Sequence, residues 1–378
     1  MRRLVCCFDP KIPLLAEVLG SHVDLRPIEG PKLSREVLRQ LRCDALFVRA
    51  HTRVDASLIE GTPVRFVGTP SSGIDHIAVE ELQELGITVA HAPGCNANAV
   101  AEYVVVALLL WEALLPKQLS EERLGIIGFG HIGRRVARYA RQLGMDIWVY
   151  DPPLARQGFE FPEWVRCVPT LQELCRNCSA ITLHVPLTRD GPDATWHLLD
   201  SELLAEIPSG ALLVQTSRGG VVAELALEIA IAERQLSTAI DVWEQEPQCN
   251  WRLAENALLA TPHIAGYTWQ ARVRCTYTLV RHFAAWAQLP VSEAPLQSAL
   301  EESIAPPPAT IPWEDRLSLL RLLLQRRKVD VDSHTLRSWR HLSPSCQEQA
   351  FRSYRDNYPR RPETLWLPED SPMPCQRT

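Results

Sequence analysis

The sequence lacks an excess of positive charge. Its 378 residues include 39 Lys and Arg against 45 Asp and Glu, which gives a formal net charge of −6. Nucleic acids and anionic membranes attract basic surfaces, so we expect neither as a partner. The first apolar run is broken by Asp9, Pro10 and Lys11 and is too short for a signal peptide. We therefore expect a cytoplasmic protein.

The 11 cysteines form no disulfide framework. Their number is odd and they are scattered along the chain, which is typical of reduced thiols in the cytoplasm. Cys175 and Cys178 form one C-x-x-C pair, but the sequence offers no second pair to complete a zinc site. We interpret this pair as two packed thiols and expect no metal.

Length and composition indicate a globular protein of two or three domains, since 46% of the residues are apolar and 22% are charged. Residues 1–93 alternate short strands and helices and contain no glycine fingerprint, which predicts a flavodoxin-like α/β substrate domain. Residues 94–265 predict a larger doubly wound sheet. A helix over 266–290 would return to the first domain, and a proline-rich stretch introduces a tail, 291–378.

The expected elements follow the apolar periodicity. In the first domain we expect strands at 4–8, 23–27, 45–48, 64–68 and 88–91, and helices at 13–19, 34–41 (with Ser34 as N-cap) and 79–85. In the second we expect strands at 146–150, 180–185, 211–216, 238–242 and 258–261, and helices at 171–176, 201–207 and 221–234. The nearly all-apolar helix over 99–115 carries Glu102 and Glu112 and is shorter than a bilayer span, which predicts a buried packing helix, or one at a subunit interface.

A glycine-rich turn after residue 124 is the most informative stretch. A short apolar strand leads into Gly128-x-Gly130-x-x-Gly133, and a helix follows over about 132–143. The first glycine permits a tight turn, the second lets backbone approach a pyrophosphate, and the third lets the helix pack on the strand. Free N–H groups at the helix start face the phosphates. The pattern predicts a Rossmann-type dinucleotide-binding domain with candidate cofactor contacts at Gly128, Gly130, His131, Ile132 and Gly133.

Asp151 indicates which of the two nicotinamide dinucleotides, NAD or NADP, is bound. It follows the strand expected at 146–150, where a carboxylate can accept from both hydroxyls of the adenosine ribose. The same charge would repel the 2′-phosphate of NADP. The sequence therefore predicts NAD as the cofactor.

Three polar side chains follow consecutive strands of the second domain. They are Arg218, Glu246 and His263. Ligands bind at the carboxyl ends of the strands in a doubly wound sheet, so these residues are candidates for catalysis. A histidine can accept a hydroxyl proton near neutral pH, a neighbouring carboxylate fixes its tautomer and stabilises the imidazolium, and an arginine can bind a carboxylate in a bidentate manner.

Several motifs together resemble the D-2-hydroxyacid dehydrogenases. The motifs are Gly128–Gly133, Asp151-Pro-Pro153, His184-Val-Pro-Leu187, Ser217-Arg-Gly219, Asp241-Val-Trp-Glu-Gln-Glu-Pro247 and Thr261-Pro-His-Ile-Ala-Gly266. Segments at 66–76, 92–97 and 266–268, with the C-terminal segment around 355–358, resemble a branch of this family that acts on a phosphorylated 2-hydroxy acid. The resemblance covers residues 40–290 densely and the two ends loosely.

The resemblance implies roles for individual residues. Arg218, Glu246 and His263 would be catalytic, with His263 as the proton donor and acceptor. Asp241 would orient the nicotinamide amide, and Val185, Thr216, Ser217, Arg218 and Gly266 would complete the cofactor site. Substrate would contact Arg49, Ala50, Ser71 and Tyr267. Ala50 departs from the family's serine, which removes one hydrogen bond worth about 0.5–1.5 kcal/mol.

Other interpretations remain open at the level of sequence. One is a D-2-hydroxyacid dehydrogenase for glycerate or phosphoglycerate, against which the tail argues because simpler members end soon after the returning helix. Another is a non-catalytic, NAD-sensing corepressor on the same fold, since fold alone does not specify function. The tail is expected to form a homodimer interface, with its aromatic face packed. A smaller alternative is that it lends an arginine to a neighbour's substrate.

Overall fold

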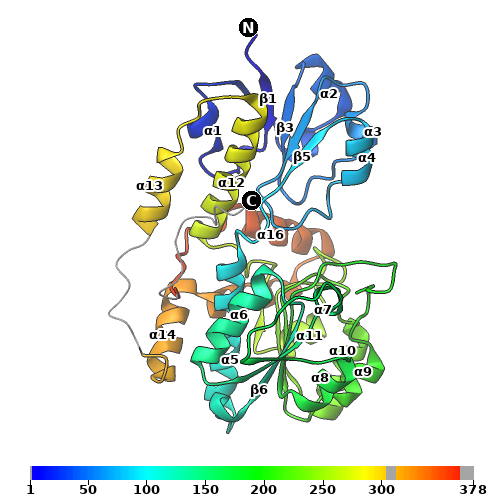
Figure 1. The fold of residues 1–378 in the computed structure, drawn as a ribbon, viewed down its shortest axis with the longest axis vertical. Helices are drawn as coiled ribbons and strands as arrows, with labels where there is room; N and C mark the ends of the chain where they lie inside the picture. Colours follow the sequence, from blue (N-terminus) through cyan, green and yellow to red (C-terminus); the bar gives the residue numbers. More distant parts are fainter. Residues whose placement is uncertain (1, 304–311, 367–378) are drawn as a thin grey trace. The chain divides into compact units, whose positions relative to one another are not determined.

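The computed structural model describes residues 2–303 and 312–366 (Figure 1). Its chain forms two compact units. Unit 1 contains Met1–Asn96, Thr268–Pro306 and Trp366–Thr378, and unit 2 contains Ala97–Tyr267 and Pro307–Leu365. The proline-rich run at 305–308 lies outside the described residues.

Unit 1 is built on a five-stranded parallel sheet. Its strand order is β2-β1-β3-β4-β5, the order of flavodoxin-like folds, as the sequence predicts. The strands are β1 (Val5–Phe8), β2 (Asp24–Pro27), β3 (Ala45–Phe47), β4 (Phe66–Gly68) and β5 (Thr88–Ala90).

Helices cover both faces of this sheet, and each face has its own hydrophobic core. One core contains Phe47, Phe66 and Phe283 and lies under α1 (Leu15–Leu19), α12 (Trp269–Ala287) and α13 (Ala294–Ser303). The other contains Leu46, Val67 and Leu82 and lies under α2 (Arg35–Gln40), α3 (Ala56–Ile59) and α4 (Val79–Glu84). Burial on both faces explains why the three central strands, β1, β3 and β4, are continuous apolar runs. The Ser34 hydroxyl accepts from the backbone of Val37, which confirms the predicted N-cap.

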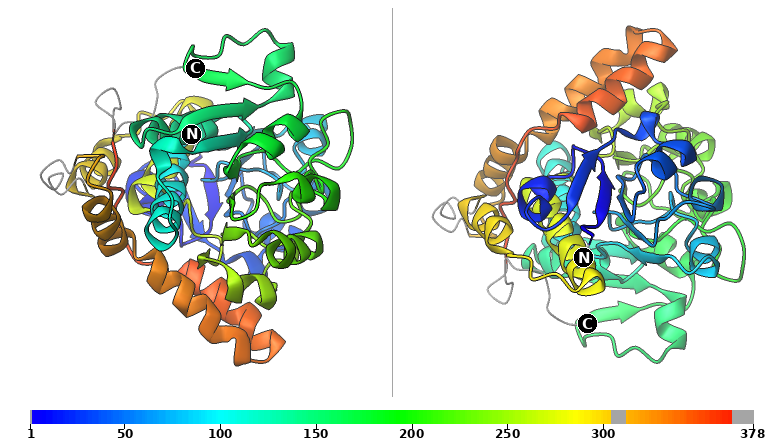
Figure 2. Two further views of the ribbon diagram at one scale, coloured as in Figure 1. Left: turned by 90° about the horizontal axis from the view of Figure 1, so that it is seen from below. Right: turned by 90° about the horizontal axis from the view of Figure 1, so that it is seen from above.

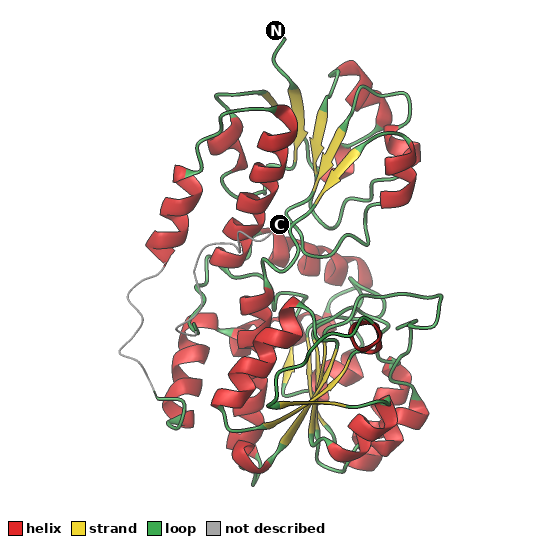
Figure 3. Cartoon of the chain, in the orientation of Figure 1, coloured by secondary structure: helices red, strands yellow, loops and turns green. Residues whose placement is uncertain are grey.

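Unit 2 is built on a seven-stranded parallel sheet. Its order, β12-β11-β10-β9-β6-β7-β8, is the Rossmann order with one further strand at an edge. The strands are β6 (Arg123–Ile127), β7 (Asp146–Tyr150), β8 (Val165–Cys167), β9 (Ala180–Leu183), β10 (Leu212–Gln215), β11 (Ser237–Ile240) and β12 (Leu259–Ala260). Figure 3 shows the strands between layers of helices. The predicted fold class, two α/β parallel sheets, is confirmed.

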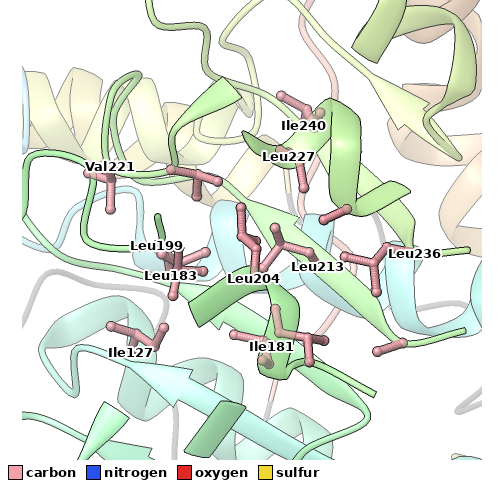
Figure 4. Packing of buried hydrophobic residues seen from close by; sticks show 14 of the residues in the cluster. Ile127, Ile181, Leu183, Leu199, Leu204, Leu213, Val221, Leu227, Leu236 and Ile240 are labelled. Carbon is pink, nitrogen blue, oxygen red and sulfur yellow. The ribbon is translucent and has the colours of Figure 1, made fainter. Parts of the chain in front are cut away.

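Helices α5 (Ala97–Leu114) and α6 (His131–Gln142) pack together on one face of this sheet. The other face is covered by α8 (Leu171–Asn177), α9 (Ser201–Glu206) and α10 (Glu224–Arg234), with α11 (Trp251–Asn256) beside α10. Figure 4 shows the core between this second layer and the strands, where Ile181, Leu213 and Ile240 meet Leu204 and Leu227. Cys175 and Cys178 are buried free thiols in the same core, as expected.

Two elements of unit 2 differ from the expectation. A short helix, α7 (Pro152–Arg156), and the edge strand β8 lie between residues 151 and 170, where no helix or strand is predicted from the sequence. Both are too short for periodicity to reveal them.

Short 3₁₀ turns occur at Gly30–Lys32, Leu119–Glu121 and Trp339–His341.

Helix α5 is the one described helix that is long and apolar enough to cross a membrane. In the structure, 78% of this span is buried inside the protein. It therefore matches the buried packing helix that the sequence predicts.

Helix α13 of the predicted tail belongs to unit 1, and residues 312–365 of the tail form α14 (Arg316–Arg327), α15 (Val329–Ser338) and α16 (Pro344–Asp356) within unit 2 (Figure 2). Helix α15 covers the edge strand β12, where the Ser333 hydroxyl accepts from the backbone N–H of Ala260 at 2.9 Å. The Arg337 guanidinium donates to the carbonyls of Ala254 and Ala257 at 2.7 and 2.6 Å. The tail therefore completes the sheet edge of this unit.

Buried ion pairs join the tail to the core of unit 2. Glu102 of α5 and Arg327 of α14 are 0% and 1% exposed, and they pair at 2.9 Å. The second oxygen of Glu102 accepts from the backbone of Leu365. Asp332 and Arg361 form a second pair at 2.6 Å. Buried charges need such partners, so loss of one member leaves the other uncompensated.

Candidate active site

The glycine-rich turn between β6 and α6 leaves room for a cofactor at one position only. Gly128 has φ +92°, and a Cβ there would stand 2.7 Å from the His184 carbonyl oxygen. A Cβ on Gly133 would stand 2.1 Å from the Gly128 carbonyl oxygen. A Cβ on Gly130 meets no described atom within 4 Å, and this glycine caps α6, which starts at His131. The open cradle at a helix N-terminus fits a dinucleotide pyrophosphate.

Asp151 lies at the end of β7, beside this turn. Its Oδ2 accepts from the backbone N–H of Phe129 at 2.7 Å, and its Oδ1 caps α7 through the N–H of Leu154 at 3.0 Å. A carboxylate oxygen has more than one acceptor site, so both oxygens can still accept from ribose hydroxyls. The carboxylate therefore has a second task, which is to hold the glycine turn against β7.

His263 and Glu246 form a close pair, as the sequence predicts. His263 Nδ1 lies 2.8 Å from Glu246 Oε2, with the two side chains 30% and 23% exposed. Burial disfavours a charge on Glu246, but the charge and hydrogen bond of His263, the charge of Arg355 and the Trp243 N–H together lower the pKa of Glu246. The carboxylate therefore holds a proton on Nδ1, which directs Nε2 as the proton acceptor.

Asp241 organises residues 261–267, the loop that follows β12 and carries this histidine (the histidine loop). Its carboxylate accepts from the Thr261 hydroxyl at 2.6 Å and from the backbone N–H groups of Ile264 and Ala265 at 2.7 and 2.9 Å. The His263 backbone has φ +55° and donates to the Asp241 carbonyl at 2.7 Å. Such a conformation is uncommon for histidine and persists where surrounding contacts enforce it. Asp241 is 2% exposed, and burial raises its pKa against the opposing charge of His263.

Arg218 follows β10 in a turn that is tied to its own strand. Gln215 donates to the Arg218 carbonyl at 3.0 Å and accepts from the Ser217 hydroxyl at 2.8 Å. The half-buried Arg218 guanidinium donates to the Ser217 carbonyl at 2.8 Å. Thr216, just before this turn, is 7% exposed.

The other predicted residues fall into two groups. His131, Ile132, Val185, Gly266 and Tyr267 lie in unit 2, in loops or helix starts that follow its strands. Arg49, Ala50 and Ser71 belong to unit 1 and follow β3 and β4. Arg49 pairs with Asp9 at 3.0 Å, and Ala50 is exposed.

Residues elsewhere in unit 2 that the sequence does not identify also support the histidine loop. The Tyr103 hydroxyl of α5 lies 2.9 Å from the Thr261 hydroxyl. Arg327 donates to the Ala265 carbonyl at 2.9 Å, and Arg355 donates to the Tyr267 hydroxyl at 3.2 Å. The sequence signal for these residues is the resemblance of the segment around 355–358 to a branch of the family, which does not identify Tyr267 as the partner of Arg355.

Comparison with known proteins agrees with the motifs. The family model described as "D-isomer specific 2-hydroxyacid dehydrogenase, NAD binding domain" matches residues 106–265. An erythronate-4-phosphate dehydrogenase of Pseudomonas fluorescens is 36% identical over 371 residues, which covers 94% of this chain and 92% of that protein. Another, from Salinibacter ruber, is 38% identical and covers 96% of this chain and 93% of its own length.

Solved structures share the fold at lower identity. A glyoxylate reductase from Paecilomyes thermophila superposes with a TM-score of 0.61 at 25% identity, covering 75% of this chain and 96% of that one. A D-lactate dehydrogenase from Aquifex aeolicus, complexed with NAD and lactic acid, gives a TM-score of 0.62 at 24% identity, with 79% and 98% covered. With relatives at 36–38% identity along nearly the whole chain, and with the family's NAD-binding domain in unit 2, the chain belongs to the D-isomer specific 2-hydroxyacid dehydrogenase family.

Proposed function

We propose that this protein oxidises 4-phospho-D-erythronate at C2 with NAD, yielding (R)-3-hydroxy-2-oxo-4-phosphooxybutanoate in the biosynthesis of pyridoxal 5′-phosphate (vitamin B6). The observation that carries the chemistry is the His263–Glu246 pair at 2.8 Å, after two strands of the dinucleotide-binding sheet. The substrate assignment is supported by the relatives, which match along nearly the whole chain, tail included.

Each of the three candidate catalytic side chains would have its own role in the oxidation. Neutral His263 accepts the C2 hydroxyl proton on Nε2 while Glu246 holds Nδ1–H and stabilises the imidazolium that forms. NAD, when bound, accepts the hydride from C2. The Arg218 guanidinium would bind the substrate carboxylate and stabilise charge on the C2 oxygen.

The cofactor would lie along the glycine turn of unit 2. Gly130 leaves the space for the pyrophosphate, and Asp151 accepts from the adenosine ribose. Asp241 would orient the nicotinamide amide, with Val185, Thr216, Ser217 and Gly266 completing the site. Arg49, Ser71, Tyr267 and the backbone at Ala50 would contact the substrate.

We further propose a cytoplasmic homodimer. Three large apolar side chains of the tail are exposed, namely Leu317 (53%), Val331 (48%) and Leu342 (43%). Exposed apolar side chains of this size are typical of a protein–protein interface when they cluster.

The direct test is NADH formation by the purified protein with 4-phosphoerythronate, compared with glycerate, lactate and 3-phosphoglycerate. We expect kcat/KM for 4-phosphoerythronate to exceed the others by at least about tenfold. Preference for glycerate or 3-phosphoglycerate would assign another activity within the family. Tight NAD binding without turnover of any of them would favour an NAD-sensing corepressor.

A further inference from the structure

Arg355, in the last turns of α16, contacts a residue of the histidine loop. Its Nη2 donates to the Tyr267 hydroxyl at 3.2 Å, and its guanidinium carbon lies 5.1 Å from the centre of the Tyr267 ring. Tyr358, just after α16, meets the same ring at 6.0 Å and nearly at a right angle. A cation over an aromatic face and an edge-to-face ring pair are both favourable contacts. Arg355 and Tyr358 of the tail therefore both contact the Tyr267 ring.

A second arginine of the tail fixes the same loop two residues earlier. Arg327 Nη2 donates to the Ala265 carbonyl at 2.9 Å, while its Nη1 pairs with Glu102. All of these residues belong to unit 2, as do His263 and Glu246. The loop that carries the histidine is thus held by the end of the neighbouring strand β11 through Asp241 and by the tail through Arg327 and Arg355.

The charge of Arg355 also reaches the catalytic pair. Arg355 favours the ionised form of Glu246. Burial acts to lower the pKa of Arg355, but Tyr267, Glu246 and Asp241 together raise it. The Nε atom of Arg355 is buried and has no hydrogen-bond partner among the described residues. This guanidinium is therefore a cation with a single described hydrogen bond, and its charge favours the ionised form of Glu246.

The remaining titratable groups around the pair are few in unit 2. Asp241 faces His263 from the end of β11, and Tyr267 follows in the same loop. Cys249 faces Glu246, but burial raises its pKa, so it stays neutral. Among the described residues, His263 and Arg355 are the cations that lower the pKa of Glu246.

We propose that Arg355 is a positioning residue of the active site, acting within its own chain: it holds Tyr267 in the histidine loop through its guanidinium, and it adds a positive charge to the surroundings of Glu246. The tail is then part of the catalytic unit, whatever it contributes to dimerisation. The effect on turnover rests on the function proposed above, whereas the effect on His263 protonation does not.

The two roles of Arg355 predict different consequences. Without the cation, Glu246 and Asp241 make the surroundings of His263 more negative, so the imidazolium persists to higher pH. Oxidation needs neutral His263, so the rise of kcat/KM with pH should move to higher pH. Loss of the clamp on Tyr267 should instead raise KM at every pH. A substitution that keeps the charge but loses the planar fork should show the second effect without the first.

The experiment compares four variants by kinetics and by NMR titration of the His263 ring in the protein without substrate, with His263→Gln to assign the signal. Arg355→Met should move both the titration and the kinetic rise to higher pH by roughly half a pH unit or more, which lowers kcat/KM on the rising limb about threefold to tenfold. Arg355→Lys should leave the titration in place and raise KM. Tyr267→Phe should do the same, because it keeps the ring and removes the hydroxyl.

Arg352→Met is the matched control. Arg352 lies on the same helix, is exposed and pairs only with Glu348 among the contacts described for it, so its loss should change neither readout. Coincident titrations of the wild type and a folded Arg355→Met would overturn the electrostatic role. Wild-type KM in both Arg355→Lys and Tyr267→Phe would overturn the clamp, even if Arg355→Met fails to fold.

Failure of the proposed function has a separate signature. If the wild type does not oxidise 4-phosphoerythronate, the substrate assignment is wrong, but the NMR titration still decides whether Arg355 acts on His263. If the wild type is active and the titration of Arg355→Met is unchanged, the function stands and this inference fails.

Discussion

Gly219 lies against Trp243 so closely that a Cβ on Gly219 would stand 1.8 Å from the Trp243 carbonyl oxygen. The contact joins the turn that carries Arg218 to the loop that carries Glu246. Neither side can give way easily, because the neighbouring atoms are backbone rather than a flexible side chain. The spacing of two catalytic candidates therefore depends on the absence of one methyl group.

We expect Gly219→Ala to lose stability and activity together. Relief of this overlap requires one of the two loops to move, which typically costs about 1–3 kcal/mol or more. Thermal unfolding and kcat measure the two effects. Gly130→Ala is the control, because its Cβ meets open space, so it should weaken NAD binding while leaving the unfolding temperature nearly unchanged. A stable, fully active Gly219→Ala would show that the two loops are not coupled in this way.

The Asp151 carboxylate should make the enzyme prefer NAD to NADP. We expect a preference of at least about tenfold in kcat/KM, or about 1.4 kcal/mol, because the charge repels a 2′-phosphate. Asp151→Asn removes the charge and keeps an oxygen that can cap α7, so it should narrow the preference. Asp151→Ala should do the same and also lose about 1 kcal/mol of stability with the cap. Equal use of NADP by the wild type would contradict the assignment.

Much of unit 2 could be predicted because its signals are local. The strand at 146–150 is found at the predicted residues, because Gly144 and Asp151 bound a short apolar run that is typical of a buried strand. Most other strands are one or two residues shorter than predicted, because the sheet pairs only their central residues. The His263–Glu246 pair also follows from a general rule, that consecutive parallel strands end at the same edge.

The tail could not be predicted in the same way. Arg327 and Glu102 are 225 residues apart, and nothing near either residue identifies the other as its partner. The contact of Arg355 with Tyr267 depends likewise on how α16 packs on unit 2. The second task of Asp241, to hold the backbone of the histidine loop, is also invisible in the sequence, where its motif suggests only a cofactor contact.

The exposed apolar residues of the tail should form the dimer interface. Leu317→Asp combined with Val331→Asp would place charges there without touching the buried ion pairs, so we expect monomers by light scattering. The matched control is Leu225→Asp with Ile229→Asp on α10, whose side chains are also exposed, at 76% and 56%. A monomeric control together with a dimeric tail variant would place the interface on α10 instead.

Half-buried His184, whose ring Nδ1 is enclosed, should make the protein sensitive to acid. Burial lowers the pKa of His184 to about 3, from an ordinary value of 6.5. Between these values the unfolded chain binds a proton that the folded chain does not, so stability falls as the pH falls through this window. At about pH 5 the loss would be about 2 kcal/mol.

His184→Gln should remove this contribution. The urea midpoint of the variant should change less between about pH 7.5 and about pH 5 than that of the wild type. His341→Gln, at an exposed position of the tail, should retain the wild-type dependence. Equal acid sensitivity of His184→Gln and the wild type would mean that His184 is not the group responsible.

The strongest test of the chemistry is the response of the catalytic pair to pH. His263 must be neutral to accept the hydroxyl proton, so oxidation should become faster as the pH rises and the imidazolium disappears. Glu246→Gln removes the charge that stabilises the imidazolium, so the rise should move to lower pH, opposite to the change expected for Arg355→Met. His263→Ala should lower kcat by about a hundredfold or more at any pH.

Arg218 tests the other half of the mechanism. Arg218→Ala should lower kcat and raise KM together, because one guanidinium would serve both substrate binding and the charge that develops at C2. Arg218→Lys should restore only part of the activity, since an ammonium group cannot form the planar bidentate contact.

If His263→Ala kept near-normal turnover with an unchanged pH profile, another group would be the proton acceptor. In that case the 2.8 Å contact between His263 and Glu246 would serve the structure of the loop and not the reaction.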